Sequence, residues 1–183
     1  METNKARERR LQAGWFDKYI TGKVIDIGVG RFESPGGADP VTPDCEMHDR
    51  HICDAHEMAV YEDFSFDCVH ASHILEHMER PTEALQNWFR ILKPGGYLII
   101  SVPERDSYER KLDLPGKWNA DHKTMWIYAG VGNSWTFNLS EFCQKALPKA
   151  KIVEYHLAVS CSNLDRLHEH GDGEYSIEII LKK

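Results

Sequence analysis

The chain has 183 residues, a length that predicts one domain over residues 1–183 with one hydrophobic core. Its formal net charge of -7 argues against a long nucleic-acid footprint, because such a footprint needs clustered Lys and Arg to neutralise phosphates. The five cysteines are scattered and odd in number, which argues against a disulfide framework and indicates a reducing compartment.

No stretch of the chain approaches the roughly 20 apolar residues that a membrane span needs. Residues 1–10 are highly charged and lack the apolar core of a secretory leader. We therefore expect a cytoplasmic protein without a membrane span. A small molecule, or the head group of a larger one, is the expected binding partner.

The first elements predicted along the chain are an amphipathic helix and a buried strand. Leu11, Trp15 and Tyr19 share one helical face, which predicts a helix over residues 6–20. A strand over residues 23–27 follows. Residues 31–43 are rich in Gly and Pro and leave room for at most a short helix.

Two short strands are predicted next, near residues 38–45 and 51–54, although two prolines weaken the first. The run Phe66-Asp67-Cys68-Val69-His70-Ala71 predicts a strand that ends in a turn. A helix or helical turn is expected to begin within Ser72–Met78.

The middle of the chain predicts a further helix and a buried strand. Pro81 suits the first turn of a helix whose apolar residues recur at helical spacing. Pro94-Gly95-Gly96 ends that helix, and Tyr97–Val102 is an apolar run typical of a buried parallel strand. The alternation of strands and helices predicts an α/β doubly wound sheet with helices on both faces.

Residues 103–136 have no clear period, and long connections of this kind are often functional. We expect them to form a substrate-side insertion within the domain. Residues 138–147 predict a helix. Residues 151–160 and 175–181 predict two strands that form a hairpin-like pair at the edge of the sheet.

Several motifs occur in a fixed order along these elements. They are Val24-Ile25-Asp26-Ile27-Gly28-Val29-Gly30, then Asp54-Ala55, then Ser72-His73-Ile74-Leu75-Glu76-His77, and then Leu92-Lys93-Pro94-Gly95-Gly96. This ordered set resembles the class I S-adenosylmethionine-dependent methyltransferases, and most closely the small methyltransferases with Leu-Glu-His and Leu-Lys-Pro-Gly-Gly signatures. The resemblance covers residues 22–103. It implies a Rossmann-like, seven-stranded, mostly parallel sheet with an antiparallel last strand.

The resemblance also implies which residues hold the cofactor, S-adenosyl-L-methionine. Asp26, Gly28 and Gly30 would surround its methionine part, because glycine lets the backbone approach and a carboxylate favours the ammonium group. Many members have a third glycine where this chain has Phe32. The loop over the methionine carboxylate is therefore expected to be unusual.

An acidic residue that ends the second strand would accept both ribose hydroxyls. Asp44 is the first choice, with Glu46 and Asp49 as alternatives. Asp54 and the backbone of Ala55 would hold the adenine amine. Residues 70–73, including His70 and Ser72, would pass beside the reacting sulfur.

Two histidines are candidates for a catalytic base, because the pKa of histidine lies near neutral. His122 lies in the irregular segment where this fold receives its substrate, and His73 follows the fourth strand of the family fold. Each also has an ordinary interpretation, as an exposed loop residue or as part of the turn.

Two patterns resemble metal sites, but we expect no metal. His73-Ile74-Leu75-Glu76-His77 matches the His-x-x-Glu-His pattern of a zinc peptidase class, yet Pro81 cuts off the long helix that such a site needs. Packing of a turn is the preferred interpretation. The Cys and His residues between positions 45 and 56 are interpreted as a polar loop.

We expect methyl transfer to an oxygen, and less readily to a nitrogen, of a small molecule or a sugar or glycan. Residues 70–73 read His-Ala-Ser-His, so the chain lacks the motifs of base amino-methylation and cytosine methylation. The alternative is a non-catalytic domain of the same fold that binds S-adenosylmethionine or a protein partner. A homodimer is left open.

Overall fold

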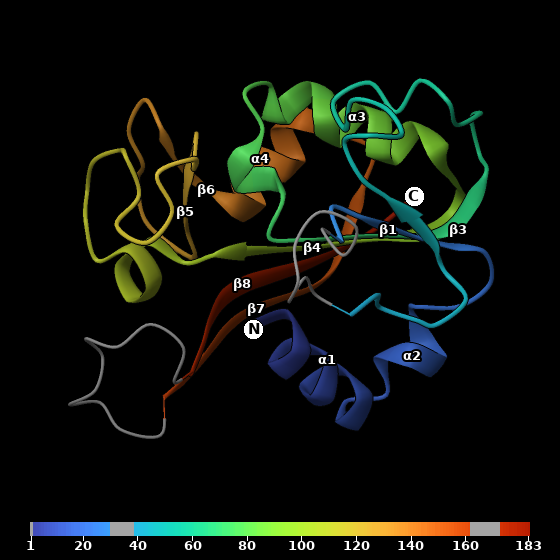
Figure 1. The fold of residues 1–183 in the computed structure, drawn as a ribbon, viewed down its shortest axis with the longest axis horizontal. Coiled ribbons are helices and arrows are strands. Elements are labelled where there is room, and N and C mark those ends of the chain that lie inside the picture. The colour runs from blue at the N-terminus through green and yellow to red at the C-terminus, as the bar shows by residue number, and fades with distance from the viewer. Residues whose placement is uncertain (1, 30–38, 162–172) are drawn as a thin grey trace.

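The computed structural model describes residues 2–29, 39–161 and 173–183 (Figure 1). Its main feature is a six-stranded sheet in the order β2-β1-β3-β4-β8-β7. The strands are β1 (Val24–Ile27), β2 (Glu46–His48), β3 (Phe66–Ser72), β4 (Leu92–Pro103), β7 (Lys151–Cys161) and β8 (Gly173–Lys182).

The sheet is mostly parallel, as the sequence predicts. β1 pairs in parallel with β2 and β3, and β3 pairs in parallel with β4. β8, the last strand of the chain, is antiparallel to both β4 and β7. The predicted mixed sheet and the terminal strand pair are therefore confirmed.

The expected count of seven strands was wrong for the described part of the chain, which forms six in this sheet. Residues 39–45 form bends and turns, and β2 begins only at Glu46. Residues 51–54 also form turns rather than a strand. These segments contain Pro40, Pro43 and short polar runs, which satisfy their backbone locally instead of pairing with a neighbouring strand.

Helices cover both faces of the sheet (Figure 1). One face carries α1 (Glu2–Gln12) and α2 (Trp15–Lys18), and the other carries α3 (Pro81–Ile91) and α4 (Leu139–Ala146). The single helix predicted over residues 6–20 is divided, because Gly14 adopts a left-handed backbone with φ of 72° between α1 and α2. The helix after Pro81 is confirmed.

The strands alternate their side chains between two apolar layers. In β3 and β4, Val69, Ala71, Leu98 and Ile100 join the larger core below α3 and α4. Cys68 and Ile99 point to the smaller core, which they share with Trp15 and Tyr19. The parallel strands are therefore apolar on both faces, as their continuous runs of apolar residues predict.

Residues 103–136 contain more structure than their sequence suggests. A π-helical turn (η2, Arg105–Glu109) is followed by β5 (Met125–Ile127) and β6 (Thr136–Asn138), which pair in parallel as a second small sheet. In Figure 1 this sheet lies beside α4, on the same side of the main sheet. None of the helices in the described ranges has the length and apolar character of a membrane span.

Candidate functional site

The carboxyl ends of β1, β2 and β3 meet at one edge of the sheet, beside a cavity of about 490 Å³. Ile27 at the end of β1 pairs with His48 of β2 and with Ala71 of β3, so the turns that follow these strands are neighbours. In open α/β sheets this edge is where ligands bind. The lining residues are Gly28, His48, Asp49, Arg50, Asp54, Ala55, His56, Ile74, His77, Met78 and Asp121.

Gly28 takes the chain out of β1 with φ of 78°, a left-handed conformation that favours glycine. Its N–H donates a hydrogen bond to the carbonyl of His48 at 2.9 Å. A Cβ atom at this position would lie 2.9 Å from Cδ1 of Ile74. The glycine is therefore required by the close approach of Ile74, which also lines the cavity.

Asp49 directly follows β2 and is 9% exposed. Its Oδ1 accepts a hydrogen bond from the N–H of Arg50 at 2.6 Å. Its Oδ2 is buried and has no hydrogen-bond partner among the described residues. A buried acceptor without a donor is costly, so this oxygen is suited to a donor that a ligand brings into the cavity.

Asp44, the first choice for the ribose, does not lie in this cavity. It precedes β2, is exposed, and lines a different hollow with Gly22 and Lys23, next to the start of β1. That hollow is at the amino ends of the strands. The placement of Asp44 was wrong because β2 begins at Glu46, so that the acid that follows the strand is Asp49.

Asp54 and Ala55 line the cavity as expected, and they also stabilise their own turn. Oδ1 of Asp54 accepts a hydrogen bond from the N–H of His56 at 2.8 Å and lies 2.6 Å from its Nδ1. These hydrogen bonds lower the pKa of Asp54, whose side chain is 50% exposed. The carbonyl of Ala55 accepts a hydrogen bond from Nε1 of Trp88 at 2.9 Å.

Asp26 and His70 lie in a buried network below the cavity rather than on its lining. Oδ2 of Asp26 accepts a hydrogen bond from the N–H of Val41 at 2.7 Å, and Oδ1 lies 2.5 Å from Nδ1 of His70. Nε2 of His70 faces a guanidinium nitrogen of Arg10 at 2.8 Å. Since Arg10 can only donate, Nε2 accepts and Nδ1 donates to Asp26.

The other predicted residues of this region are placed in different ways. Ser72 is buried at the end of β3, and its hydroxyl has no hydrogen-bond partner within the described ranges. His73 has φ of 54°, and its Nε2 lies 3.0 Å from the hydroxyl of Ser176 on β8. Neither residue lines the cavity. Gly30 lies outside the described residues.

His122 is buried, with 6% of its surface exposed, and not in an open loop. Its Nδ1 hydrogen-bonds to Oε1 of the buried Glu109, which the π-helical turn η2 supplies. The backbone N–H groups of Lys123 and Thr124 donate to the carbonyl of Glu76 at 2.8 and 3.1 Å. These two hydrogen bonds hold the His122 loop against η1 (Leu75–His77), a turn of 3-10 helix.

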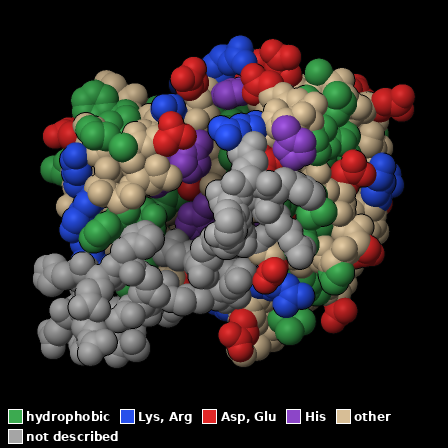
Figure 2. All heavy atoms as spheres, in the orientation of Figure 1, with side chains coloured by type: hydrophobic (Ala, Val, Ile, Leu, Met, Phe, Trp, Pro, Cys, Tyr) green, Lys and Arg blue, Asp and Glu red, His purple; other side chains and the backbone are tan. Residues whose placement is uncertain are grey.

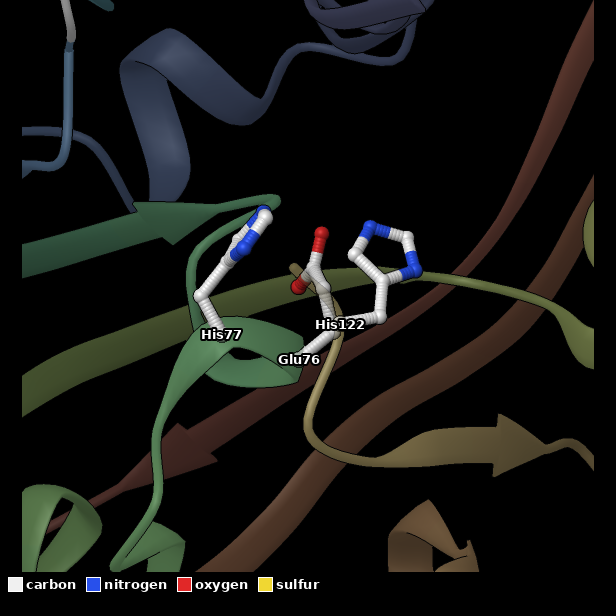
Figure 3. Close-up of side chains that lie close together, drawn as sticks. All are labelled: Glu76, His77 and His122. Atoms are coloured by element: carbon white, nitrogen blue, oxygen red, sulfur yellow. The ribbon is translucent and has the colours of Figure 1, made fainter. Parts of the chain in front are cut away.

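His122 consequently meets two residues of η1, Glu76 and His77 (Figure 3). The rings of His77 and His122 lie 4.9 Å apart in an edge-to-face arrangement, and the carboxylate of Glu76 points between them. Burial raises the pKa of Glu76, but a hydrogen bond from His73 and the nearby histidines lower it overall. Figure 2 shows histidine side chains gathered around the centre of this face.

The sequence contains a signal for part of this cluster, in a motif that by itself is equally typical of a packed turn. His73-Ile74-Leu75-Glu76-His77 places Glu76 and His77 side by side, and only the folded 103–136 segment adds His122 and Asp121. Ile74, which contacts Gly28, carried no sequence signal of its own.

A family model described as a methyltransferase domain matches residues 8–144. The chain belongs to this methyltransferase family. A curated relative, probable methyltransferase ltbC of Aspergillus luteorubrus, is 26% identical over 153 residues, which cover 64% of this chain and 54% of that protein. The chain thus spans about half the length of this relative, and 25% of another curated protein that it matches.

Solved structures of methyltransferases share the fold. A methyltransferase of Thermotoga maritima, described as a possible histamine N-methyltransferase, aligns with a TM-score of 0.56 and 20% identity over 96% of this chain and 98% of that one. An S-adenosylmethionine-dependent methyltransferase of Archaeoglobus fulgidus aligns with a TM-score of 0.56 and 20% identity over 99% and 94%. The chain therefore contains a methyltransferase domain with the fold of these solved S-adenosylmethionine-dependent enzymes, and S-adenosylmethionine is the cofactor that this likeness implies.

The cavity of this methyltransferase domain fits that cofactor in three respects. It lies at the carboxyl ends of the first strands, it has room for a small molecule, and the unpartnered Oδ2 of Asp49 can accept a hydrogen bond from a hydroxyl group. Asp26 does not line the cavity, and its two carboxylate oxygens contact Val41 and His70 inside the protein.

Proposed function

We propose that this domain transfers the methyl group of S-adenosylmethionine to an oxygen of a small molecule or sugar. The observation that carries the proposal is the cavity at the ends of β1 and β2. Asp49 lines this cavity, and its buried Oδ2 has no hydrogen-bond partner among the described residues. His77 and Asp121 line the same cavity from the side of the 103–136 segment. One cavity therefore provides contacts for both a cofactor and an acceptor.

On the cofactor side, Asp49 accepts a hydrogen bond from a ribose hydroxyl through Oδ2, the oxygen that has no partner among the described residues. The turn at Asp54 and Ala55 lies against the adenine. Gly28 and Ile74 pack together at the turn after β1 and form part of the cavity lining. Asp26 acts as a positioning residue, since it links β1 to Val41 and His70.

The acceptor lies beside His77 and Asp121, at the cluster that Glu76 and His122 complete. Bound S-adenosylmethionine would supply an electrophilic methyl group to an acceptor oxygen here. The carbon–sulfur bond would break with its electron pair going to sulfur, and the hydroxyl proton of the acceptor would pass to water. The leaving group is a neutral thioether formed from a cation, so the protein chiefly has to align the two atoms and exclude water. The acidic net charge agrees with a small acceptor rather than a nucleic acid.

Calorimetric titration with S-adenosylmethionine tests the cofactor site. We expect Asp49→Asn to weaken binding about 10- to 100-fold, the loss of one hydrogen bond to a charged acceptor. Asp44→Asn is the matched control, because it makes the same change at the opposite end of β2 and should leave binding unchanged. Absence of binding by the wild type, or equal binding by Asp49→Asn, would contradict the assignment.

Methyl transfer is tested by a screen with labelled cofactor across sugars, phenols and amines. Transfer to a hydroxyl acceptor is the expected result. Binding of the cofactor without transfer to any of the acceptors would instead support a non-catalytic domain. The role of His122 as a base remains a prediction from the sequence, and unchanged turnover in His122→Ala would remove it.

A further inference from the structure

Three side chains that can ligate a metal converge next to the cofactor cavity. Glu76, His77 and His122 each offer one ligand atom, and these atoms lie within 4.8 Å of one another. Figure 3 shows the Glu76 carboxylate between the two imidazole rings. Two of the residues come from η1 and the third from the loop before β5, so the tertiary structure assembles the group.

The buried carboxylate of Glu76 lacks one expected partner. Glu76 is 1% exposed, and its Oε2 has no hydrogen-bond partner in the described part of the chain. Its Oε1 lies 3.5 Å from Nδ1 of His73. A buried charged oxygen without a donor or a cation is costly, so something that binds Oε2 would relieve that cost.

Each of the two histidines also has a carboxylate partner of its own. Nδ1 of His122 is bound to Glu109, and Nδ1 of His77 lies 3.3 Å from Oδ2 of Asp121. A carboxylate that accepts the Nδ1 proton leaves Nε2 with its lone pair, and this arrangement orients histidine ligands in metalloproteins. Glu109 is itself buried and accepts from the N–H of Lys117 at 2.6 Å, so the position of His122 is well defined.

From this geometry we infer that Glu76, His77 and His122 bind a divalent first-row transition-metal ion. Two imidazole nitrogens and one carboxylate oxygen suit ions such as Zn²⁺, Mn²⁺, Fe²⁺ or Co²⁺, whereas Mg²⁺ and Ca²⁺ prefer oxygen ligands only. Within the described residues, the cysteines and histidines of 45–56 do not bring three possible ligand atoms together. Glu76, His77 and His122 do.

Three protein ligands leave at least one coordination position open, which is typical of catalytic rather than structural sites. His77 lines the cofactor cavity, so the open position lies near the acceptor. On the proposed function, on which this step rests, the ion binds the acceptor hydroxyl and lowers its pKa. The hydroxyl proton passes to water, the oxygen bonds to the methyl carbon, and the electron pair of the carbon–sulfur bond goes to sulfur.

This assignment gives His122 a role different from that of a general base. A base uses Nε2 to accept a proton, whereas a ligand uses the same lone pair for the metal. Chelation distinguishes the two, because a base would act equally well in metal-free protein.

The test begins with the full chain after treatment with a chelator. Co²⁺ is titrated while the visible absorption is recorded, and Zn²⁺ is titrated by calorimetry. We expect one ion per chain and at least 100-fold weaker binding in Glu76→Gln and His122→Gln. Glu109→Gln removes only the outer carboxylate and should weaken binding about 10- to 100-fold.

The matched control is His156→Gln. His156 also forms a histidine–carboxylate pair, with Nε2 2.8 Å from Oε2 of Glu154, but no third ligand joins it in the described part of the chain. This variant should bind the ion as the wild type does. Circular dichroism verifies that each variant is folded, and Glu76→Gln keeps the shape of the side chain. Absence of Co²⁺ absorption in the wild type, or unchanged binding in folded Glu76→Gln, would overturn the metal site.

Parallel titrations with S-adenosylmethionine keep the two proposals separate. Cofactor binding without ion binding would overturn the metal site and leave the proposed function standing. Ion binding without cofactor binding would overturn the proposed function and support the metal site. Equal methyl transfer by metal-free and Co²⁺-loaded protein would overturn the role of the ion in holding the acceptor.

Discussion

At the scale of single residues, the turn after β1 depends on the absence of one side chain. Gly28 combines φ of 78° with a backbone so close to Ile74 that a Cβ atom would lie 2.9 Å from its Cδ1. Gly14 has a similar φ of 72°, but no atom lies within 4 Å of the Cβ position. Substitutions at these two glycines therefore distinguish the free-energy cost of a left-handed backbone, which both share, from the cost of steric overlap, which only Gly28 has.

We predict that Gly28→Ala lowers the free energy of unfolding by about 3 kcal/mol, since a left-handed residue costs about 1–2 kcal/mol and overpacking adds about 1–3 kcal/mol. Gly14→Ala should cost only about 1–2 kcal/mol. Urea unfolding measures both. Ile74→Ala should lower the free energy of unfolding less in the Gly28→Ala background than in the wild type, because it removes the side chain with which the added Cβ overlaps. Equal costs for the two glycine variants would contradict the steric explanation.

At the scale of elements, buried ion pairs attach α1 to β8. Arg10 is buried and hydrogen-bonds to Oε1 of Glu178, whose Oε2 lies 2.5 Å from Arg9. Arg9 also contacts Glu174 at 2.6 Å. Burial raises the pKa of Glu178, but the charges of Arg10 and Arg9 and their hydrogen bonds lower it overall. Arg10 also contacts His70, and His70 hydrogen-bonds to Asp26 on β1. This chain of contacts connects α1 to the strand that precedes the cavity.

The pH dependence of stability follows from the lowered pKa of Glu178. Because this pKa is lower in the folded state, the stabilisation is complete above the unfolded pKa of about 4.3 and is lost as the pH falls through the folded value. Arg9 and Arg10 bind this carboxylate directly. Glu174 also binds Arg9, His70 contacts Arg10, and His156 stands opposite Glu178 in the pairing of β7 with β8.

We predict that Glu178→Gln lowers the free energy of unfolding by about 3–5 kcal/mol at pH 7, because it leaves buried Arg10 without its counter-charge. The loss should shrink as the pH is lowered from 5 towards 3. Urea unfolding at several pH values measures this. Glu8→Gln, at an exposed position of α1, is the control and should change stability little at any pH. A loss that stays constant with pH would contradict the assignment.

At the scale of the whole molecule, the two apolar layers share one sheet. Cys68 lies in the smaller layer beside α2, and Cys143 lies on α4 in the larger layer. Both thiols are fully buried, and burial raises the pKa of Cys143 to about 12 and raises that of Cys68 as well. Each cysteine therefore reports whether its own layer opens.

We predict that single-cysteine variants retaining Cys68 or Cys143 react with a thiol reagent at the same slow rate, set by global unfolding. A variant retaining only the partly exposed Cys45 should react at least about 10³-fold faster, since no global opening is needed. Labelling followed over time measures these rates. Faster labelling of Cys143 than of Cys68 would show that α4 opens independently of the sheet.

The sequence by itself determined the elements whose signals are local. Strand patterns identified β3, β4, β7 and β8, although β4 begins at Leu92 and not at Tyr97, and Pro81 with apolar residues at helical spacing identified α3. The ordered motifs also indicated the methyltransferase family, which the family match confirms. Local patterns succeed here because strand and helix periodicities are properties of neighbouring residues.

Only the tertiary structure decided which side chains meet. Because β2 begins at Glu46, Asp49 follows the strand and lines the cavity, whereas Asp44 precedes the strand and lies at its other end. A shift of a few residues in the strand bounds is enough to change which acid lies at the cavity. Likewise, Glu76 and His122 are distant in sequence and meet because backbone hydrogen bonds join their loops. Contacts of this kind depend on strand order and loop path, which no local pattern records.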